Sequence, residues 1–205
     1  MPIFVFTLLN RKAAVCCGFF LLLWASVYAG AAHAQKGKWY SESDVAPALK
    51  LKTIDNQEID LAALKGRIVI VNFWATWCAP CVAEMPSLQA LGARLGEKNA
   101  VVLGVNYHES PQKISDFLAK HPVTFPLLRD PWQEASGEWK VRVLPTTFIV
   151  DAAGVLRYRV VGEVDWGSKD VADRLKKILA SGATSKTPSQ RSAKGELKNL
   201  AAHAG

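Results

Sequence analysis

The sequence predicts an α/β domain in which helices cover both faces of a central mixed sheet. Residues 68–74 (IVIVNFW) form a run of β-branched and aromatic side chains, which is typical of a buried central strand. Apolar residues then recur at spacings of three and four over residues 82–95, which predicts a helix directly after that strand. Residues 143–150 and 155–161 are joined by a glycine-bearing turn and predict a hairpin. Strands that alternate with helices before a final hairpin indicate a mixed sheet.

The other predicted elements are shorter. Residues 39–47 are expected to be a loose lead-in, and residues 48–59 alternate apolar and polar side chains around Asp55-Asn56, which predicts an N-terminal hairpin extension. The remaining expectations are a helical turn at 61–65, a buried strand at 101–106, a helix after Pro111, a short strand at 125–128, a helical segment at 132–139 and a closing helix through 171–179.

Both ends of the chain are predicted to lie outside the domain. Arg11 and Lys12 precede an uncharged stretch at residues 13–32, and the Ala-His-Ala at 32–34 fits the small-residue rule for cleavage. The stretch is also long enough to span a bilayer. Residues 1–34 are therefore either a cleaved signal peptide or a membrane anchor, and either one places the domain in the periplasm. We expect a lead-in at 35–47, the domain at 48–180 and a disordered basic tail at 181–205.

The charge balance limits the classes of partner. The formal charge is +7, and removal of residues 1–34 would lower it to +5. Residues 181–205 carry +3 of that remainder, so the predicted domain is nearly neutral. A nearly neutral domain does not favour a nucleic-acid partner, and a basic tail is typical of solvated disorder or weak attraction to anionic lipid.

Two cysteines remain beyond residue 34, and they are the main functional signal. Cys78 and Cys81 are two residues apart at the start of a predicted helix, in a chain bound for an oxidising compartment. A structural bridge is the alternative, but it would close a very short loop and stabilise little. A zinc site lacks ligands, because the domain adds only scattered His108 and His121. Haem attachment requires a histidine where Val82 stands. The pattern favours a redox disulfide, with no metal and no other cofactor.

The position of the pair assigns a role to each sulfur. Unpaired backbone N–H groups at a helix start favour a thiolate on the first cysteine, so Cys78 is the expected attacking sulfur. Cys81 lies one turn further along and is screened by Pro80, so it is expected to resolve the mixed disulfide.

These motifs resemble a known family. "VNFWATWCAPC" and "VLPTTFIVDAAG" resemble the thioredoxin fold, and "LKGRIVIVNFWATWCAPCVAEMP" with "VVLGVNYHESPQKISDFL" resembles its exported TlpA/ResA/CcmG branch of thiol:disulfide reductases, over residues 49–179. The resemblance implies a thioredoxin-like fold that reduces protein disulfides. It also implies a membrane thiol reductase as electron donor and an apocytochrome c or a copper-handling protein as target. We expect a monomer.

The resemblance also implies roles for residues around the pair. Trp77 resembles the aromatic residue that shields the cysteines, although a partly exposed core tryptophan would look the same in sequence. Pro145 resembles the cis-proline that packs against the disulfide and blocks metal capture; an ordinary trans proline is the alternative. Leu144 is expected to offer its backbone to an extended target segment. Together with Trp77 and Leu144, Pro80 and Thr146 complete the expected substrate-binding set.

Glu84 is the candidate for proton transfer. It lies on the same helical face as both cysteines, and the resemblance assigns a glutamate near the pair to this role. A glutamate stabilised only by the helix dipole is the alternative. Asn72 stands where cytoplasmic thioredoxin has an aspartate, and an amide cannot accept a proton at ordinary pH. Either Glu84 or water is therefore expected to take the proton from Cys81.

The sequence leaves further interpretations open. Ala79-Pro80 offers few donors to a thiolate, which favours a reductant over a strong oxidant. The same fold could serve as a Cu(I)-binding chaperone or as a thiol peroxidase that reacts through the first cysteine. Tyr107, His108 and Glu109 follow the second buried strand, where they either shape a target groove or are merely polar loop groups, and the second interpretation is favoured.

Overall fold

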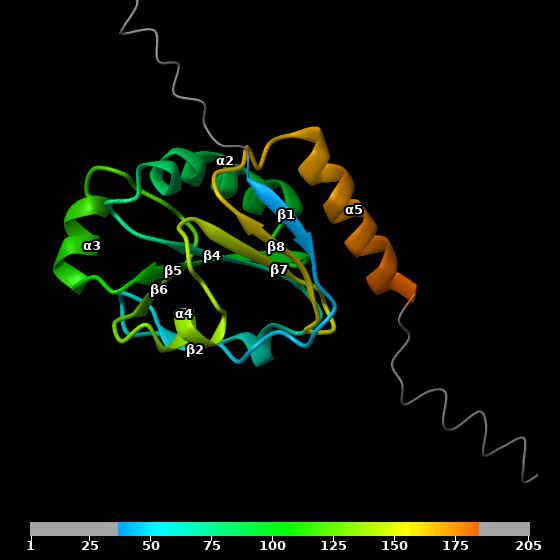
Figure 1. Cartoon of the computed structure of the whole chain (residues 1–205), viewed down its shortest axis with the longest axis horizontal. Coiled ribbons are helices and arrows are strands. Elements are labelled where there is room, and N and C mark those ends of the chain that lie inside the picture. The colour runs from blue at the N-terminus through cyan, green and yellow to red at the C-terminus, as the bar shows by residue number, and fades with distance from the viewer. Residues whose placement is uncertain (1–36, 185–205) are drawn as a thin grey trace, which may run out of the picture. The chain divides into compact units, whose positions relative to one another are not determined.

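A mixed sheet lies at the centre of residues 37–184, the part of the chain that the computed structural model describes (Figure 1). Its strands lie in the order β1 (Lys38–Ser41), β8 (Leu156–Val161), β7 (Thr146–Val150), β4 (Ile68–Trp74), β5 (Ala100–Tyr107) and β6 (Leu127–Asp130). β4, β5 and β6 run parallel, whereas β7 pairs antiparallel with β4, β8 with β7 and β1 with β8. The prediction of a mixed sheet is confirmed.

Helices cover both faces of the sheet. The larger ones, α2 (Ala79–Leu95) and α5 (Lys169–Thr184), pack on one face, and α4 (Glu134–Glu138) lies on the other with the 3-10 helix η1 (Leu61–Leu64) (Figure 1). The remaining elements are α3 (Pro111–Leu118) and the separate antiparallel hairpin of β2 (Lys50–Lys52) and β3 (Glu58–Asp60), which is the predicted N-terminal extension. This is the α/β architecture that the strand and helix pattern predicted.

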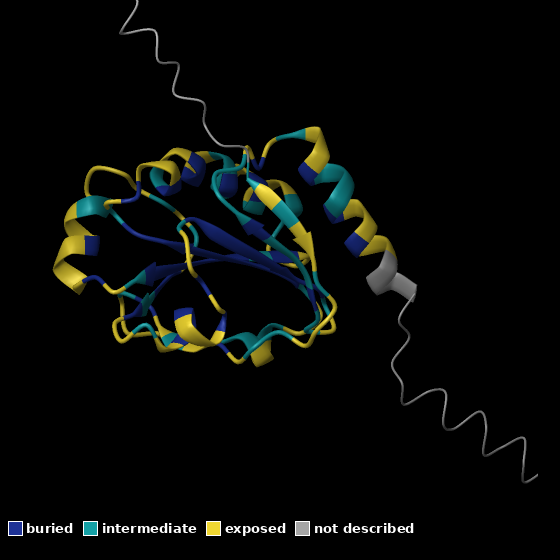
Figure 2. Ribbon diagram, viewed as in Figure 1, coloured by how far each residue is buried: buried dark blue, intermediate teal, exposed yellow. Residues whose placement is uncertain are grey.

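β4 is the strand on which the core is built. All its residues are buried, and Figure 2 shows the central strands as the dark, solvent-excluded layer between exposed helix surfaces. Successive side chains of a strand point to opposite faces. Val69, Val71 and Phe73 accordingly pack with Trp139 and Phe148 on one face. The other face carries Ile68 and Ile70, which pack against Leu88, Leu91, Trp166 and Leu175.

The strand directions bring four loops to one edge of the sheet. Because β4, β5 and β6 are parallel, the loops that follow them leave from the same edge. β7 runs antiparallel to β4, with Thr146 opposite Phe73, so the loop that precedes β7 arrives at this edge too. The loop from β4 to α2 carries the cysteines, and the loop before β7 carries Pro145. The fold therefore brings the cysteine motif and the proline motif together at one edge of the sheet.

The expected lead-in at residues 35–47 is wrong in one respect. Residues 38–41 form β1, which pairs with β8 at the edge of the sheet, Trp39 standing opposite Val160. The Trp39 ring packs edge-on against Tyr158, and the Arg174 guanidinium lies 4.6 Å from its centroid. A four-residue edge strand is stabilised by partners more than 100 residues away, so its own sequence does not reveal it.

Several boundaries also differ from expectation. β6 begins at Leu127, two residues later than predicted, and the helical segment near Trp132 is reduced to the five residues of α4. α5 continues to Thr184, past the domain boundary expected at residue 180. No helix within residues 37–184 has the length and apolarity needed to cross a bilayer. The predicted signal peptide or anchor, and the predicted tail beyond residue 184, lie outside the described residues.

Candidate active site

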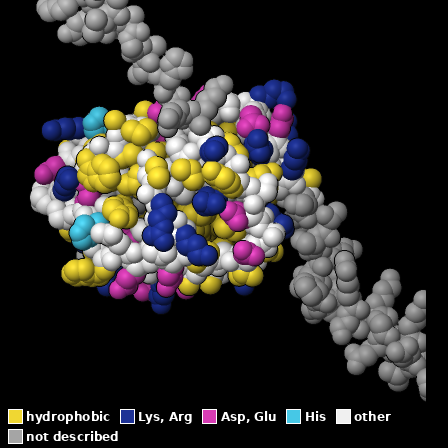
Figure 3. All heavy atoms as spheres, viewed as in Figure 1, with side chains coloured by type: hydrophobic (Ala, Val, Ile, Leu, Met, Phe, Trp, Pro, Cys, Tyr) yellow, Lys and Arg dark blue, Asp and Glu magenta, His cyan; other side chains and the backbone are white. Residues whose placement is uncertain are grey.

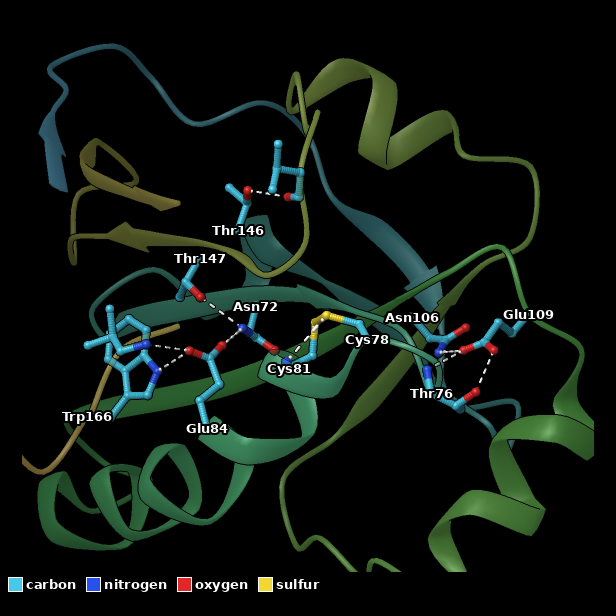
Figure 4. Close-up of a disulfide and its surroundings, with 12 residues drawn as sticks. Asn72, Thr76, Cys78, Cys81, Glu84, Asn106, Glu109, Thr146, Thr147 and Trp166 are labelled. Carbon is cyan, nitrogen blue, oxygen red and sulfur yellow. Dashed lines mark hydrogen bonds between the residues drawn. A yellow bond between two sulfur atoms is a disulfide. The ribbon is translucent and has the colours of Figure 1, made fainter. Parts of the chain in front are cut away.

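The two cysteines lie at the junction between the loop that follows β4 and the start of α2, and a disulfide joins them (Figure 4). Cys78 is the N-cap of α2, and its Sγ accepts a hydrogen bond from the backbone N–H of Cys81 at 3.3 Å. Cys78 is 5% exposed and Cys81 is fully buried, so the first sulfur is the more accessible one. This difference matches the roles predicted for an attacking and a resolving sulfur.

Residues flanking the pair present an apolar surface. Trp77, directly before Cys78, is 62% exposed, so it is not a core residue and its ring is open to a partner. Val143 is also exposed, and the neighbouring Leu144 packs against the cluster that contains both cysteines. Pro80 is exposed at the start of α2 and leaves Cys81 buried beneath the first turn. Exposed apolar groups beside a reactive centre are typical of a protein-binding surface.

The loop before β7 contains the predicted cis-proline. The Leu144–Pro145 peptide bond is cis, and the Pro145 ring is buried. The side chain of Thr146 is turned inward, where its Oγ1 donates a hydrogen bond to the Val143 carbonyl at 2.6 Å. Thr146 is thus held inside the loop rather than displayed beside the exposed Trp77. The Thr146 side chain is therefore placed to support the loop before β7, and a target would meet the exposed residues of that loop instead.

Glu84 is a buried carboxylate rather than a surface group at a helix terminus. It is 2% exposed and projects from α2 toward Asn72 and Trp166 (Figure 4). Its Oε1 accepts from Asn72 Nδ2 at 2.7 Å, and its Oε2 accepts from the Val164 backbone N–H at 3.0 Å and from Trp166 Nε1 at 3.2 Å. Burial raises the pKa of Glu84 to about 7, and these three hydrogen bonds offset part of the rise. A carboxyl group with this pKa can take up and release a proton near neutrality.

The Asn72 side chain, on β4, makes its hydrogen bonds through its amide nitrogen alone. Nδ2 donates to Glu84 Oε1 and, at 2.8 Å, to Thr147 Oγ1, which uses both of its hydrogens. The amide oxygen Oδ1 is buried and has no hydrogen-bond partner. Such a group costs about 1–3 kcal/mol relative to a satisfied one. This acceptor is one of four unpartnered side-chain atoms buried within residues 37–184.

A second carboxylate, Glu109, holds the loop that carries the pair. It follows β5, is 8% exposed, and accepts hydrogen bonds from the Thr76 backbone N–H at 2.7 Å and from Thr76 Oγ1 at 2.6 Å. Asn106 Nδ2 donates to it at 2.9 Å, and Lys113 Nζ lies 2.7 Å from its Oε1. Burial alone would raise its pKa, but the Lys113, Thr76 and Asn106 hydrogen bonds together hold the pKa of Glu109 below its ordinary value.

This arrangement gives different roles to Tyr107, which ends β5, and to His108 and Glu109, which follow it. Glu109 braces the active-site loop, whereas the Tyr107 hydroxyl donates to Gln133 Oε1, and His108 Nδ1 lies 2.6 Å from the Pro131 carbonyl. The preference for merely polar loop groups therefore missed Glu109. Its position in the sequence could have indicated this role. Thr76 precedes Cys78 by two residues, and Glu109 follows β5, the strand next to β4, so the two loops were expected to meet.

A sizeable groove in the described residues lies away from the cysteines. A groove of about 690 Å³ lies between α2 and the hairpin region, with Asp60, Arg67, Gly92 and Phe125 among its lining residues, and it contains none of the predicted site residues. Within residues 37–184 no group of three or more His, Cys, Asp or Glu side chains is placed to hold a metal ion. The chemistry available at the sheet edge is that of two sulfurs and a titratable carboxyl group.

Known proteins share this combination of fold and motif. The AhpC/TSA family model matches residues 43–159. Thiol-disulfide oxidoreductase ResA of Oceanobacillus iheyensis is 35% identical over 129 residues, which cover 61% of this chain and 67% of ResA. The thioredoxin-like protein YneN of Bacillus subtilis is 35% identical over 133 residues, covering 63% of this chain and 77% of YneN.

A solved structure agrees with these matches. The crystal structure assigned to a thiol:disulfide interchange protein DsbE of Chlorobium tepidum superposes with a TM-score of 0.63 at 26% identity, covering 67% of this chain and 97% of that chain. The thioredoxin-like fold predicted from the two motifs is confirmed. The chain belongs to the AhpC/TSA family, and its relatives at 35% identity include a named thiol-disulfide oxidoreductase.

Proposed function

We propose that this protein is an extracytoplasmic thiol:disulfide oxidoreductase that reduces protein disulfides through Cys78 and Cys81. The observation that carries the proposal is the asymmetric pair at the start of α2, in which Cys78 keeps 5% of its surface exposed and Cys81 is fully buried. The relatives named as thiol-disulfide oxidoreductases support it. The buried Glu84 in the same helix supplies a group that can exchange a proton.

Reduction of a target proceeds in two exchanges. The Cys78 thiolate attacks a target sulfur, the target disulfide breaks, and the departing target sulfur takes a proton from solvent to become a thiol. Cys81 then loses its proton, which Glu84 accepts, and attacks Cys78 Sγ. The Cys78–Cys81 bond forms and the second target sulfur leaves, also as a thiol after protonation. Two electrons have passed from the pair to the target.

The residues between the sulfurs support a reducing role. The Cys81 N–H donates to Cys78 Sγ, while Pro80 has no N–H to offer. A thiolate with few donors is less stabilised, so the reduced pair gives up electrons more readily. The pair is therefore proposed to be maintained in the reduced state by a membrane thiol reductase, with an apocytochrome c or a copper-handling protein as the target.

The proposed target surface runs along the sheet edge. Trp77, directly before Cys78, and Val143, two residues before Pro145, offer exposed apolar side chains, and Leu144 offers its backbone to an extended segment. The proposed location is the periplasm, reached by cleavage of residues 1–34 or with these residues kept as an anchor. We propose that the protein works as a monomer and needs no cofactor beyond its disulfide.

Trapping tests this function. In the Cys81→Ser variant the mixed disulfide cannot be resolved, so a covalent complex with the target is expected to accumulate in cells and to be released by dithiothreitol. Cys78→Ser is the matched control and should trap nothing. A Cys81→Ser protein that captures no partner would contradict the proposal.

Two other activities are separated by direct assays. Stoichiometric, tight binding of Cu(I) by the reduced wild-type protein would indicate a copper chaperone. Rapid peroxide consumption that depends on Cys78 but not on Cys81 would indicate a peroxidase. We expect neither outcome from a pair that exchanges electrons with protein disulfides.

A further inference from the structure

The amide of Asn72 has a vacant acceptor in the oxidised protein. Both hydrogens of Nδ2 are committed, to Glu84 and to Thr147, whereas Oδ1 is buried without a donor. Asn72 lies between Glu84 and Cys81 (Figure 4). In Figure 4 the amide nitrogen faces Glu84 and Thr147, and the amide oxygen lies on the side of Cys81.

Reduction creates the donor that this acceptor lacks. Opening the disulfide takes up two electrons and two protons from an incoming dithiol, which itself becomes a disulfide. One proton resides on Cys81 Sγ, and the other is lost when Cys78 ionises. Cys81 is fully buried, so its new S–H group has no water to bind and must find a partner inside the protein.

We infer that Asn72 Oδ1 accepts a hydrogen bond from the Cys81 S–H group in the reduced protein. This inference rests on the proposed function, because it concerns the reduced state of the same pair. Asn72 is then a positioning residue: it holds the resolving thiol protonated and oriented until the mixed disulfide forms. The hydrogen bond exists only in the reduced state, so the disulfide state alone carries the unsatisfied acceptor.

The S–H stretching vibration tests the inference directly. The Cys78→Ala variant of the full chain leaves Cys81 as a lone thiol and removes the Cys78 sulfur, which is the competing acceptor. Subtracting the infrared spectrum of Cys78→Ala/Cys81→Ser isolates the Cys81 band from those of Cys16 and Cys17. We expect this band at lower frequency than that of a thiol in an apolar solvent, as a hydrogen-bonded donor requires.

Asn72→Leu in the Cys78→Ala background is expected to return the band to the free-thiol position. Thr147→Val is the matched control, since it removes a partner of Nδ2 but leaves Oδ1 in place, and the band should stay shifted. A Cys81 band at the free-thiol position in the Cys78→Ala protein itself would overturn the inference, whether or not the Asn72→Leu variant folds.

A redox equilibrium gives the second readout. Asn72→Leu removes the unpartnered acceptor from the oxidised state and the S–H partner from the reduced state, so it should shift the equilibrium with glutathione about tenfold toward the disulfide. A tenfold change corresponds to 29.6 mV. The comparison is made in a Glu84→Gln background, so that a change in the charge of Glu84 does not contribute. An unchanged equilibrium would count against the inference.

These readouts are independent of the proposed activity. If the trapping experiment failed while the Cys81 band remained shifted, the proposed function would be wrong and the hydrogen bond would stand. If trapping succeeded while the band lay at the free-thiol position, the reductase would stand and Asn72 would have only a structural role.

Discussion

At the scale of single residues, burial decides how the site can handle protons. Glu84 accepts hydrogen bonds from Asn72 of β4 and from Val164 and Trp166, which precede α5. Its burial outweighs these hydrogen bonds and raises its pKa to about 7. The sequence placed Glu84 on the cysteine-bearing face, but the depth of its burial depends on Trp166, which comes from a distant loop. No local pattern could have predicted that contact.

Glu84 is expected to make stability depend on pH. Its pKa is about 7 in the folded protein against an ordinary value of 4.5, so between these values the folded state binds more protons than the unfolded state. The favourable contribution is fully present below pH 4.5 and is lost as pH rises to about 7. Relative to Glu84→Gln, the wild-type oxidised protein should lose about 3 kcal/mol of unfolding free energy over this range.

Denaturant unfolding of both proteins at several pH values measures this difference. In the Glu84→Gln variant the rate of target reduction should also lose its dependence on a group that titrates near pH 7, because Glu84 is the proposed proton acceptor. Parallel stability curves and identical rate profiles for the two proteins would leave Glu84 with no proton-linked role.

At the scale of elements, loops from adjacent strands brace one another. Glu109 follows β5 and fixes Thr76 in the loop that follows β4, so the presentation of Cys78 depends on the neighbouring strand. Sheet topology brings these loops together, and sequence separation hides the relationship. Strong periodic elements such as β4 and α2 were predicted closely, whereas the contacts between their loops were not.

Glu109→Gln tests this brace. A neutral amide would turn its own N–H groups toward donors already present at Thr76, Asn106 and Lys113, so the variant should lose about 1–3 kcal/mol of stability. The displaced loop should also lower kcat/KM for target reduction about tenfold. Asp116→Asn is the control, because this exposed carboxylate on α3 bonds only to Gln112 among the interactions found for it. Equal effects of the two substitutions would contradict the brace.

β1 gives the clearest case of an element that only its partners define. Its four residues carry no periodic signal, and the strand is held through Trp39, which contacts Tyr158, Trp166 and Arg174. The hairpin at β2 and β3 was predictable because it is local, with a turn between two short alternating runs. Local pairing is visible in sequence, and pairing across 120 residues is not.

Trp39→Ala should therefore destabilise the protein by about 2–3 kcal/mol, since the ring is partly buried and loses aromatic and cation–π contacts. Tyr40→Ala on the same strand is the matched control and should cost less, because Tyr40 is more exposed. Thermal or denaturant unfolding measures both. If Tyr40→Ala proved the more damaging substitution, β1 would not be anchored through Trp39.

At the scale of the whole molecule, charge has little influence on target choice. Lys and Arg side chains are interspersed with Asp and Glu on the face shown in Figure 3, and residues 35–180 carry a formal charge near +2. Apolar side chains occupy a large part of the same face. Recognition is therefore expected to depend on apolar contact and backbone pairing near the disulfide rather than on electrostatic steering.

The salt dependence of the reaction checks this expectation. We expect kcat/KM for a protein disulfide to change less than about threefold between low and physiological ionic strength, because a weak net field is little affected by screening. The Trp77→Ala variant should raise KM more than any neutralised surface lysine. A steep fall of kcat/KM with added salt would instead indicate a charged target and a recognition surface other than this edge.

The reduction potential of the Cys78–Cys81 pair tests the central claim most directly. Equilibration of the purified protein with a glutathione or dithiothreitol redox buffer, followed by quantification of free thiols, gives this value. A reductant of protein disulfides should have a potential near that of thioredoxin, about −270 mV. A value near −120 mV, the range of strong oxidants, or a disulfide that does not open in dithiothreitol, would contradict the account.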